Sequence, residues 1–302
     1  MFKRYAAAFM AVLMAAVLAG CAQTPEVPQG TTQSTQPAQP TQATQPPATQ
    51  PSATIPETTV VDNENCTFRI VALEEDSLWG YALKVFLENK TDKDLMFSLR
   101  DVSVNGYMCD PLFAAAVSAG MKANEVISFL QEDLTSNDIT EVTDLAFTLA
   151  VYDSNNWSAE PLVDEDFSFF PMGKEAVRDY PRTAGPEDRV LFDNEDCTMI
   201  ITGFEPDSLW GYSMGVYLEN KTDDTLMFSV GDAAINGFMC DPYWAVTVAG
   251  GKKCNTEISW LNSALEENAI NQVQTITLPV RVYESDDWTG DDLLNQTFEI
   301  TP

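Results

Sequence analysis

The chain contains no histidine, and this absence excludes several kinds of chemistry. Ser–His and Cys–His nucleophile pairs, histidine general bases and most catalytic zinc sites all need an imidazole. The sequence also lacks a glycine-rich phosphate loop and a Cys-x-x-Cys pair. Pairs of carboxylates are present, but the enzymes that hydrolyse glycosides with them are usually built around deep clefts in larger folds. We therefore expect no enzyme activity, no catalytic residue, no metal site and no cofactor.

Basic residues are also scarce, since 16 lysines and arginines stand against 46 aspartates and glutamates and give a net charge of −30. Loss of Lys3 and Arg4 with an N-terminal signal leaves 14 basic residues and a net charge of −32. A chain this acidic is repelled by phosphate backbones and by anionic lipid surfaces. The charge argues against nucleic acid as a partner and is typical of a surface exposed to solvent.

The N-terminus has the pattern of an export signal. Residues 1–20 contain two basic residues, an apolar run over 5–18 and small residues at the end, and the run is too short for a membrane-spanning helix. The sequence LAGC at 18–21 resembles the lipobox of bacterial lipoproteins. That resemblance implies cleavage before Cys21 and a lipid on its sulfur, which would hold the protein on the outer side of the cell membrane. The alternative is an ordinary signal peptide that ends at a cysteine.

Residues 21–60 form a segment of different composition, made almost entirely of Thr, Gln, Pro, Ala and Ser. Such a segment has too little apolar surface to offset the entropy of ordering, so we predict a disordered linker. With Pro-rich stretches rising about 3.1 Å per residue, it could span on the order of 100 Å.

The rest of the chain is a gap-free internal duplication, in which 61–171 reappears as 192–302. The sequences DSLWGY at 76–81 and ENKTD at 88–92 recur at 207–212 and 219–223. A unit of this length is domain-sized and longer than a solenoid repeat. We therefore predict two tandem domains, 61–171 and 192–302, joined by a linker over 172–191.

Alternation of apolar and polar residues is the main periodic signal in each repeat, and it predicts an all-β fold. The alternating positions of the first repeat are Tyr81, Leu83, Val85 and Leu87, and then Leu145, Phe147, Leu149 and Val151. Short strands in this number fit two tandem immunoglobulin-like β-sandwiches, with a short helical turn or loop over 131–140.

Turn and strand irregularities can be predicted from single positions. Asn105-Gly106 and its copy Asn236-Gly237 each follow an apolar run and predict two-residue hairpins. A change of phase near 100–101 predicts a β-bulge. Pro279 interrupts an alternating run and predicts an edge strand or a bulge at that point.

Three runs carry a resemblance to a known family: LENKTD at 87–92, DVSVNG at 101–106 and AGMK at 119–122. They resemble an immunoglobulin-like domain of unknown function that is found in tandem in secreted lipoproteins of Gram-positive gut bacteria. More distantly, they are similar to the immunoprotective extracellular domains of mycobacteria. The resemblance covers both repeats and implies a fold but no ligand.

Four cysteines recur in pairs at the same separation. These are Cys66 with Cys109 and Cys197 with Cys240. We interpret them as two disulfides, each of which would contribute about 4 kcal/mol in the chain-entropy model. The alternative is four small buried thiols, because duplication alone also makes the pairs recur. Cys254 aligns with Ala123 and is interpreted as a small buried residue.

Four tryptophans are candidates for a ligand-facing platform: Trp79, Trp157 and their copies Trp210 and Trp288. Aromatic residues in alternating strands more often pack in the core, which is the competing interpretation. Two further tryptophans, Trp244 and Trp260, replace phenylalanines of the first repeat, which indicates packing. Acidic clusters such as 62–64, 92–94 and 164–166 could bind calcium in loops, but solvated turns explain them better.

The sequence therefore predicts a membrane-anchored surface lipoprotein that displays two immunoglobulin-like domains. Its expected partners are the membrane, through the lipid on Cys21, and an extracellular protein or glycan. The alternative is a structural spacer or envelope component without a ligand. A binding module needs an exposed apolar or aromatic patch, and a spacer needs none.

Overall fold

The computed structural model describes residues 55–76, 80–111, 113–209, 211–287 and 289–302, all of which belong to one compact unit. Residues 1–54 lie outside the described residues, and with them the predicted signal, Cys21 and most of the predicted linker. Trp79, Trp210 and Trp288 also lie outside the described residues. Nowhere in the described part of the chain is there a helix both long and apolar enough to cross a bilayer.

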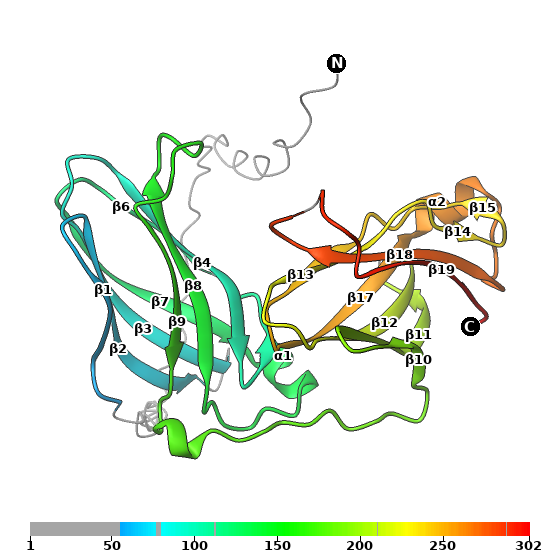
Figure 1. The fold of residues 1–302 in the computed structure, drawn as a ribbon, viewed down its shortest axis with the longest axis horizontal. Helices are drawn as coiled ribbons and strands as arrows, with labels where there is room; N and C mark the ends of the chain where they lie inside the picture. Colours follow the sequence, from blue (N-terminus) through cyan, green and yellow to red (C-terminus); the bar gives the residue numbers. More distant parts are fainter. Residues whose placement is uncertain (1–54, 77–79, 112, 210, 288) are drawn as a thin grey trace, which may run out of the picture. The chain divides into compact units, whose positions relative to one another are not determined.

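The first repeat consists of β1 (Thr58–Asp62), β2 (Cys66–Asp76), β3 (Gly80–Asn89), β4 (Leu95–Val104), β5 (Tyr107–Met108), β6 (Ala114–Val117), β7 (Lys122–Leu130), α1 (Gln131–Ser136), β8 (Leu145–Asp153) and β9 (Val163–Phe169). One layer has the strand order β1-β2-β3-β7. In the other, β4 pairs with β5, β6 and β8, and β8 pairs with β9. The strands of these two layers are visible in Figure 1.

The two layers of the first repeat share one hydrophobic core. Phe68 of β2 and Phe147 of β8 meet across it with ring centroids 6.3 Å apart. On β3, the alternating residues Leu83, Val85 and Leu87 are almost completely buried, as the sequence pattern predicts. Burial of each such side chain contributes about 1.5–3 kcal/mol.

A connecting segment with the single-turn helix η1 (Lys174–Ala176) leads to the second repeat. Its elements are β10 (Arg189–Asp193), β11 (Cys197–Ser208), β12 (Gly211–Asn220), β13 (Leu226–Val230), β14 (Ala234–Ile235), β15 (Phe238–Met239), β16 (Ala245–Val248), β17 (Lys253–Leu261), α2 (Asn262–Glu267), β18 (Ile276–Glu284) and β19 (Leu294–Ile300). The layers are β10-β11-β12-β17 and β15-β14-β18-β13-β16, with β19 beside β18.

The second repeat has its own hydrophobic cluster, in which Trp244 and Trp260 are buried. The interpretation of these two residues as packing residues is confirmed. The predicted all-β fold, with strands arranged in packed sheets, is also confirmed. Whether each repeat folds alone stays a prediction, because Tyr217 and Ile200 of the second repeat contact the core of the first.

The predicted turns and irregularities are largely confirmed. Asn105 and Gly106 have φ angles of 49° and 84°, which is the left-handed geometry of a two-residue hairpin. The register of β4 against β8 shifts between Arg100 and Ser103, and Asp101 has a φ of 50°, so the bulge is present. Helix α1 occupies the start of the segment predicted as a helical turn.

The prediction for Pro279 is half right. Its strand, β18, is central and not at an edge, since it pairs with β19 on one side and with β13 and β14 on the other. Pro279 pairs with Thr297 of β19, but it falls in the gap between the residues that pair with β14 and those that pair with β13. Proline has no N–H to donate, and it therefore lies where the hydrogen-bond ladder of β18 is already interrupted.

The predicted end of the N-terminal linker needs correction. Residues 21–60 were expected to be disordered, but Ile55 is buried and β1 begins at Thr58. The composition of 55–60 does not indicate a strand. One buried isoleucine and two threonines that pair with β2 are nevertheless enough to extend the sheet. The second repeat begins in the same way, since β10 starts at Arg189, within the predicted linker 172–191.

Candidate functional site

Trp157 is the one candidate platform tryptophan that the structure describes. It lies in the connection between β8 and β9, and 67% of its surface is exposed. Its ring packs on Tyr152 of β8, with centroids 4.8 Å apart and planes inclined by 50°. Tyr152 is half-buried and pairs with Met96 of β4, so the aromatic pair is attached to the sheet through Tyr152. An exposed indole is thus held over a tyrosine at the loop end of the first repeat.

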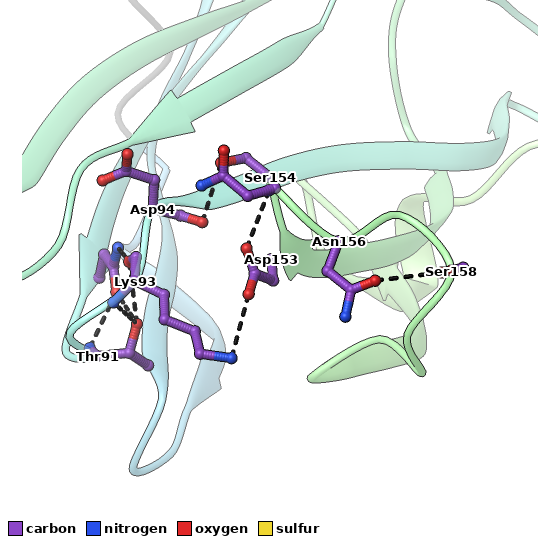
Figure 2. Close-up of polar contacts among 9 residues, drawn as sticks. Thr91, Lys93, Asp94, Asp153, Ser154, Asn156 and Ser158 are labelled. Atoms are coloured by element: carbon purple, nitrogen blue, oxygen red, sulfur yellow. Dashed lines mark hydrogen bonds and ion pairs between the residues drawn. The ribbon is translucent and has the colours of Figure 1, made fainter.

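The loop that carries Trp157 is organised by Asp153, the last residue of β8. Its carboxylate accepts a hydrogen bond from the N–H of Asn155 at 2.9 Å, and its carbonyl accepts one from the N–H of Asn156 at 2.9 Å. The hydroxyl of Ser158 donates to the Asn156 side chain at 3.2 Å, as Figure 2 shows. These bonds on both sides of Trp157 limit the conformations of the loop.

A second loop, between β3 and β4, is joined to the first (Figure 2). The Lys93 ammonium lies 3.1 Å from the Asp153 carboxylate. The N–H and the hydroxyl of Ser154 both donate to the carbonyl of Asp94, at 3.0 and 3.1 Å. The Asn155 N–H, and then Lys93, hold the pKa of Asp153 below its ordinary value, so this carboxylate is charged at neutral pH.

The β3–β4 loop is itself rigid because of a buried asparagine. The amide of Asn89 donates to the carbonyls of Lys93 and Val117, at 2.7 and 2.8 Å. Its oxygen accepts from the N–H and the hydroxyl of Thr91, at 2.9 and 2.8 Å. Asn220 makes the same four bonds in the second repeat. The recurring ENKTD sequence is therefore a structural motif of the loop.

The equivalent loops of the second repeat differ in charge. Position 224, the counterpart of Lys93, is an aspartate, and the counterpart of Asp153 is Glu284. The loops are still joined, since the N–H of Ser285 donates to the carbonyl of Thr225 at 2.9 Å. Two acids thus replace the ion pair, so the two repeats present different surfaces at the same place in the fold.

The aromatic pair can bind an uncharged ring or an apolar side chain. The flat faces of Trp157 and Tyr152 offer apolar area at little entropic cost, and the neighbouring amide, hydroxyl and charged groups supply hydrogen bonds. Such a combination fits the face of a sugar ring or an aromatic or aliphatic side chain of a protein. Within the described ranges, no three Cys, Asp or Glu side chains are grouped so that they could hold a metal ion.

The acidic cluster at 62–64 is occupied by the protein's own groups. Asp62 accepts hydrogen bonds from the Lys90 ammonium at 2.5 Å and from the Thr67 hydroxyl at 2.9 Å. Asn63 accepts the N–H groups of Asn65 and Cys66, which closes the turn between β1 and β2. The cluster thus acts as a structural turn, and Lys90 already supplies the positive charge that calcium would bring.

The predicted disulfides are absent, which corrects the interpretation of the cysteines. Cys66, Cys109, Cys197 and Cys240 are all free thiols. Burial is the main cause that raises the pKa of the Cys66 and Cys197 thiols to about 11 and that of Cys109 to about 12. These thiols are protonated at neutral pH and are poor nucleophiles. Cys254 is buried, as expected.

The topology explains why the bridges do not form. Cys66 pairs with Asn89, whose amide reaches Val117, and Val117 pairs with the first residue of β4. Cys109 lies at the other end of β4, where its N–H donates to Val102. At about 3.3 Å per residue, the two ends are on the order of 20 Å apart, whereas a disulfide needs Cα atoms within about 7 Å.

An open cleft of about 790 Å³ is lined by residues of both repeats. Its walls carry several carboxylates, among them Asp101 and Asp166, together with Arg100 and Lys252. Burial raises the pKa of Asp101, Arg100 opposes this rise, and the charge of Asp166 adds to it. Arg100 forms an ion pair with Asp164 there. The Thr148 hydroxyl in the cleft wall donates a hydrogen bond to the Asp166 carboxylate at 2.6 Å. The expectation of no enzyme activity stays a prediction.

Comparison with known proteins adds little to this description. The chain matches no protein-family model and no curated protein sequence. Among solved structures, it is similar to the CsuC–CsuE chaperone–tip adhesion subunit pre-assembly complex from archaic chaperone-usher Csu pili of Acinetobacter baumannii, with 11% identity, 73% of this chain and 91% of that chain covered, and a TM-score of 0.21. It is also similar to the YadV chaperone, with 11% identity, coverage of 72% and 92%, and a TM-score of 0.19. Likeness at this level carries no information on ligands.

Proposed function

We propose that this chain is a surface lipoprotein, anchored through Cys21, whose repeats serve as an extracellular binding module. The single observation that supports a ligand is Trp157, which is 67% exposed and rests on Tyr152 in a loop fixed by hydrogen bonds. The platform formed by these two rings is the binding site of the proposal. Its ligand is a glycan or an extracellular protein.

The charge of the chain restricts the class of ligand further. With a net charge of −30, the chain attracts basic ligands, does not repel neutral ones, and repels nucleic acids and anionic lipids. Lys93 is neutralised by Asp153, so the platform itself carries little net charge. An uncharged glycan or a basic protein surface fits these conditions.

The second candidate function is a structural spacer without a ligand. It is favoured by the recurring motifs, because ENKTD and the Asn-Gly hairpins are explained by hydrogen bonds and backbone geometry within each repeat. The two candidates differ in one respect that an experiment can measure: a spacer loses nothing when the exposed platform is removed.

The platform is tested by Trp157→Ala. In glycan and extracellular-protein arrays with soluble residues 49–302, we expect the parent chain to bind and Trp157→Ala to bind about 10- to 100-fold more weakly, as is usual for an aromatic anchor. Tyr243→Ala is the matched control, because Tyr243 is a 91% exposed aromatic residue in the second repeat. Absence of binding by the parent chain, or equal losses in both variants, would leave the spacer as the better proposal.

The anchor is tested by Cys21→Ser. A serine cannot form the thioether, so we expect this variant to move from the membrane fraction to the soluble fraction, while the parent chain stays with the membrane. Mass spectrometry of the mature N-terminus should find acyl chains on Cys21. Thr24→Ser is the control, since it leaves the cysteine in place. An unmodified Cys21 in the parent protein contradicts the proposed anchor.

A further inference from the structure

The two repeats contact each other through a short parallel strand pair within the compact unit. Tyr107 of β5 pairs with Lys253 of β17, and the Lys253 N–H donates to the carbonyl of Gly106 at 2.9 Å. Beside this pair, the amide of Asn255 donates to the side-chain oxygen of Asn137 at 2.7 Å. The Lys253 ammonium lies 5.6 Å from the centre of the Tyr107 ring. Tyr107 is almost completely buried, and its hydroxyl donates to the carbonyl of Tyr180 in the connecting segment at 3.2 Å.

The contact is heterologous, because the first repeat contributes β5 and α1 and the second contributes β17. Each repeat therefore has a counterpart of the surface that the other one uses. On β7 of the first repeat, Lys122 and Asn124 stand at the positions equivalent to Lys253 and Asn255. The donors of the contact thus occur a second time, with the same residue types.

The acceptors at Gly106 and Asn137 also occur a second time, in the second repeat, whereas the carbonyl of Tyr180, which accepts from the Lys253 ammonium at 3.3 Å, lies in the connecting segment and has no counterpart. Gly237 is the counterpart of Gly106, and Asn268 is the counterpart of Asn137. Asn268 follows α2 as Asn137 follows α1, with almost the same backbone angles. Phe238 replaces Tyr107 and keeps an aromatic ring for a lysine to cover.

Among the residues that the structure describes, no strand pairs with either of these second surfaces. β7 is the edge strand of its sheet, and β15 is the edge strand of another. Phe238 and Met239 of β15 are 49% and 65% exposed, whereas the equivalent Tyr107 is 2% exposed. Val126 of β7 and Met121, immediately before β7, are exposed apolar residues. Edge strands with exposed apolar residues are templates for pairing with another chain.

We propose that copies of this chain associate head to tail, with β15 of one copy on β7 of the next. In this contact, the N–H of Lys122 donates to the carbonyl of Gly237 and the amide of Asn124 donates to Asn268, as their counterparts do within the chain. The Lys122 ammonium, which within the chain lies 3.1 Å from the Glu88 carboxylate and 5.9 Å from the centre of the Phe86 ring, turns to cover the ring of Phe238. Because the contact is heterologous, each added copy presents a new open end, and the assembly grows into a filament or closes into a ring.

The strength of this association is limited by two conditions. The contact within one chain is helped by a linker, which supplies an effective concentration on the order of millimolar, and the contact between chains has no such help. The net charge of −30 also makes the copies repel one another. We therefore expect association only at high protein concentration. It should be stronger at ~0.5 M salt than at ~0.05 M salt, because the higher salt concentration screens the repulsion between copies.

Sedimentation velocity of residues 49–302 over a range of concentrations tests the proposal. The parent chain should form oligomers of increasing size. Lys122→Pro should raise the dissociation constant at least about tenfold, because proline has no N–H to donate. The equivalent Lys253 N–H points toward β5, so the Lys122 N–H points away from β3 and is not needed in its own sheet. Lys122→Ala keeps the N–H and should retain most of the association.

A mixing experiment tests whether the contact is heterologous. Phe238→Asp introduces a charge on β15 and should prevent association on that side. At concentrations where the parent chain associates, neither Lys122→Pro nor Phe238→Asp alone should form oligomers. Their mixture should form dimers and nothing larger, since each supplies the surface that the other lacks. Dimers in the mixture also show that both variants fold. A parent chain that stays monomeric at every concentration, or association that neither substitution changes, overturns the proposal.

Discussion

Asn89→Ala should lower the free energy of unfolding by about 4 kcal/mol, because it leaves several buried polar groups of the backbone without partners. Asn89 is only 1% exposed, and its side chain makes four hydrogen bonds. The carbonyl of Val117 is the most deeply buried of the partners. Water cannot replace the lost amide there without opening the end of the sandwich.

The duplication supplies a matched experiment. Asn220 of the second repeat makes the same bonds at the same distances, so Asn220→Ala should cost as much as Asn89→Ala. Asn155→Ala, at an exposed position of the neighbouring loop, should change the stability by no more than about 0.5 kcal/mol. Urea unfolding followed by tryptophan fluorescence measures all three. A loss below about 1 kcal/mol in Asn89→Ala would contradict the structural role of the motif.

The second large effect is expected for Gly211→Ala, which should destabilise the second repeat by about 3–5 kcal/mol through backbone strain and steric overlap. Gly211 has a φ of 144°, a conformation that residues with a side chain rarely adopt. A Cβ atom at this position would lie 2.1 Å from the carbonyl oxygen of Trp260 on the adjacent strand. Relief of this overlap requires β12 and β17 to separate where Gly211 pairs with Leu261.

Gly231→Ala is the control for this prediction. No atom lies within 4 Å of the added Cβ at Gly231, so the substitution should be neutral or slightly stabilising. Calorimetry of the two variants measures the difference between them. Equal melting temperatures for Gly211→Ala and the parent protein would mean that β12 and β17 are not held as closely as the structure has them.

Local patterns were good guides to the fold of each repeat. The alternation at Leu83, Val85 and Leu87 predicted which side chains fill the core. The hairpin at Asn105-Gly106 was predictable because two consecutive residues with positive φ strongly favour Asn and Gly. The bulge near Asp101 was predictable because a change of phase must be absorbed by an extra residue. Each of these features depends on residues that are neighbours in the sequence.

The cysteines show where such reasoning fails. Cys66 and Cys109 recur as a pair in both repeats, but the recurrence reflects duplication and says nothing about distance. The strand order places them at opposite ends of β4. Strand order depends on contacts between residues far apart in the chain, which no local pattern records.

The candidate site was only partly predictable. Trp157 could be singled out as an aromatic residue in a turn, but its exposure could not be read from its neighbours. The contact between Trp157 and Tyr152 joins residues that are close together in the sequence. The bonds of Asp153 to Lys93 and of Ser154 to Asp94, in contrast, join the loop to a distant part of the chain. The recurring ENKTD sequence did mark the second loop as a special segment. It recurs, however, because its asparagine and threonine hold the loop together, and it does not indicate a binding site.

The amino-acid sequence by itself determined the duplication, the acidic character, the all-β fold and the positions of the turns, because each of these depends on composition or on side chains close together in the chain. Only the tertiary structure decided that the thiols stay apart, that Trp157 is exposed, and that the β5 edge of one repeat is covered while the equivalent β15 edge of the other is open. These outcomes depend on strand order and on contacts between the repeats. Two repeats that arose by duplication and share one fold can therefore differ in what they expose.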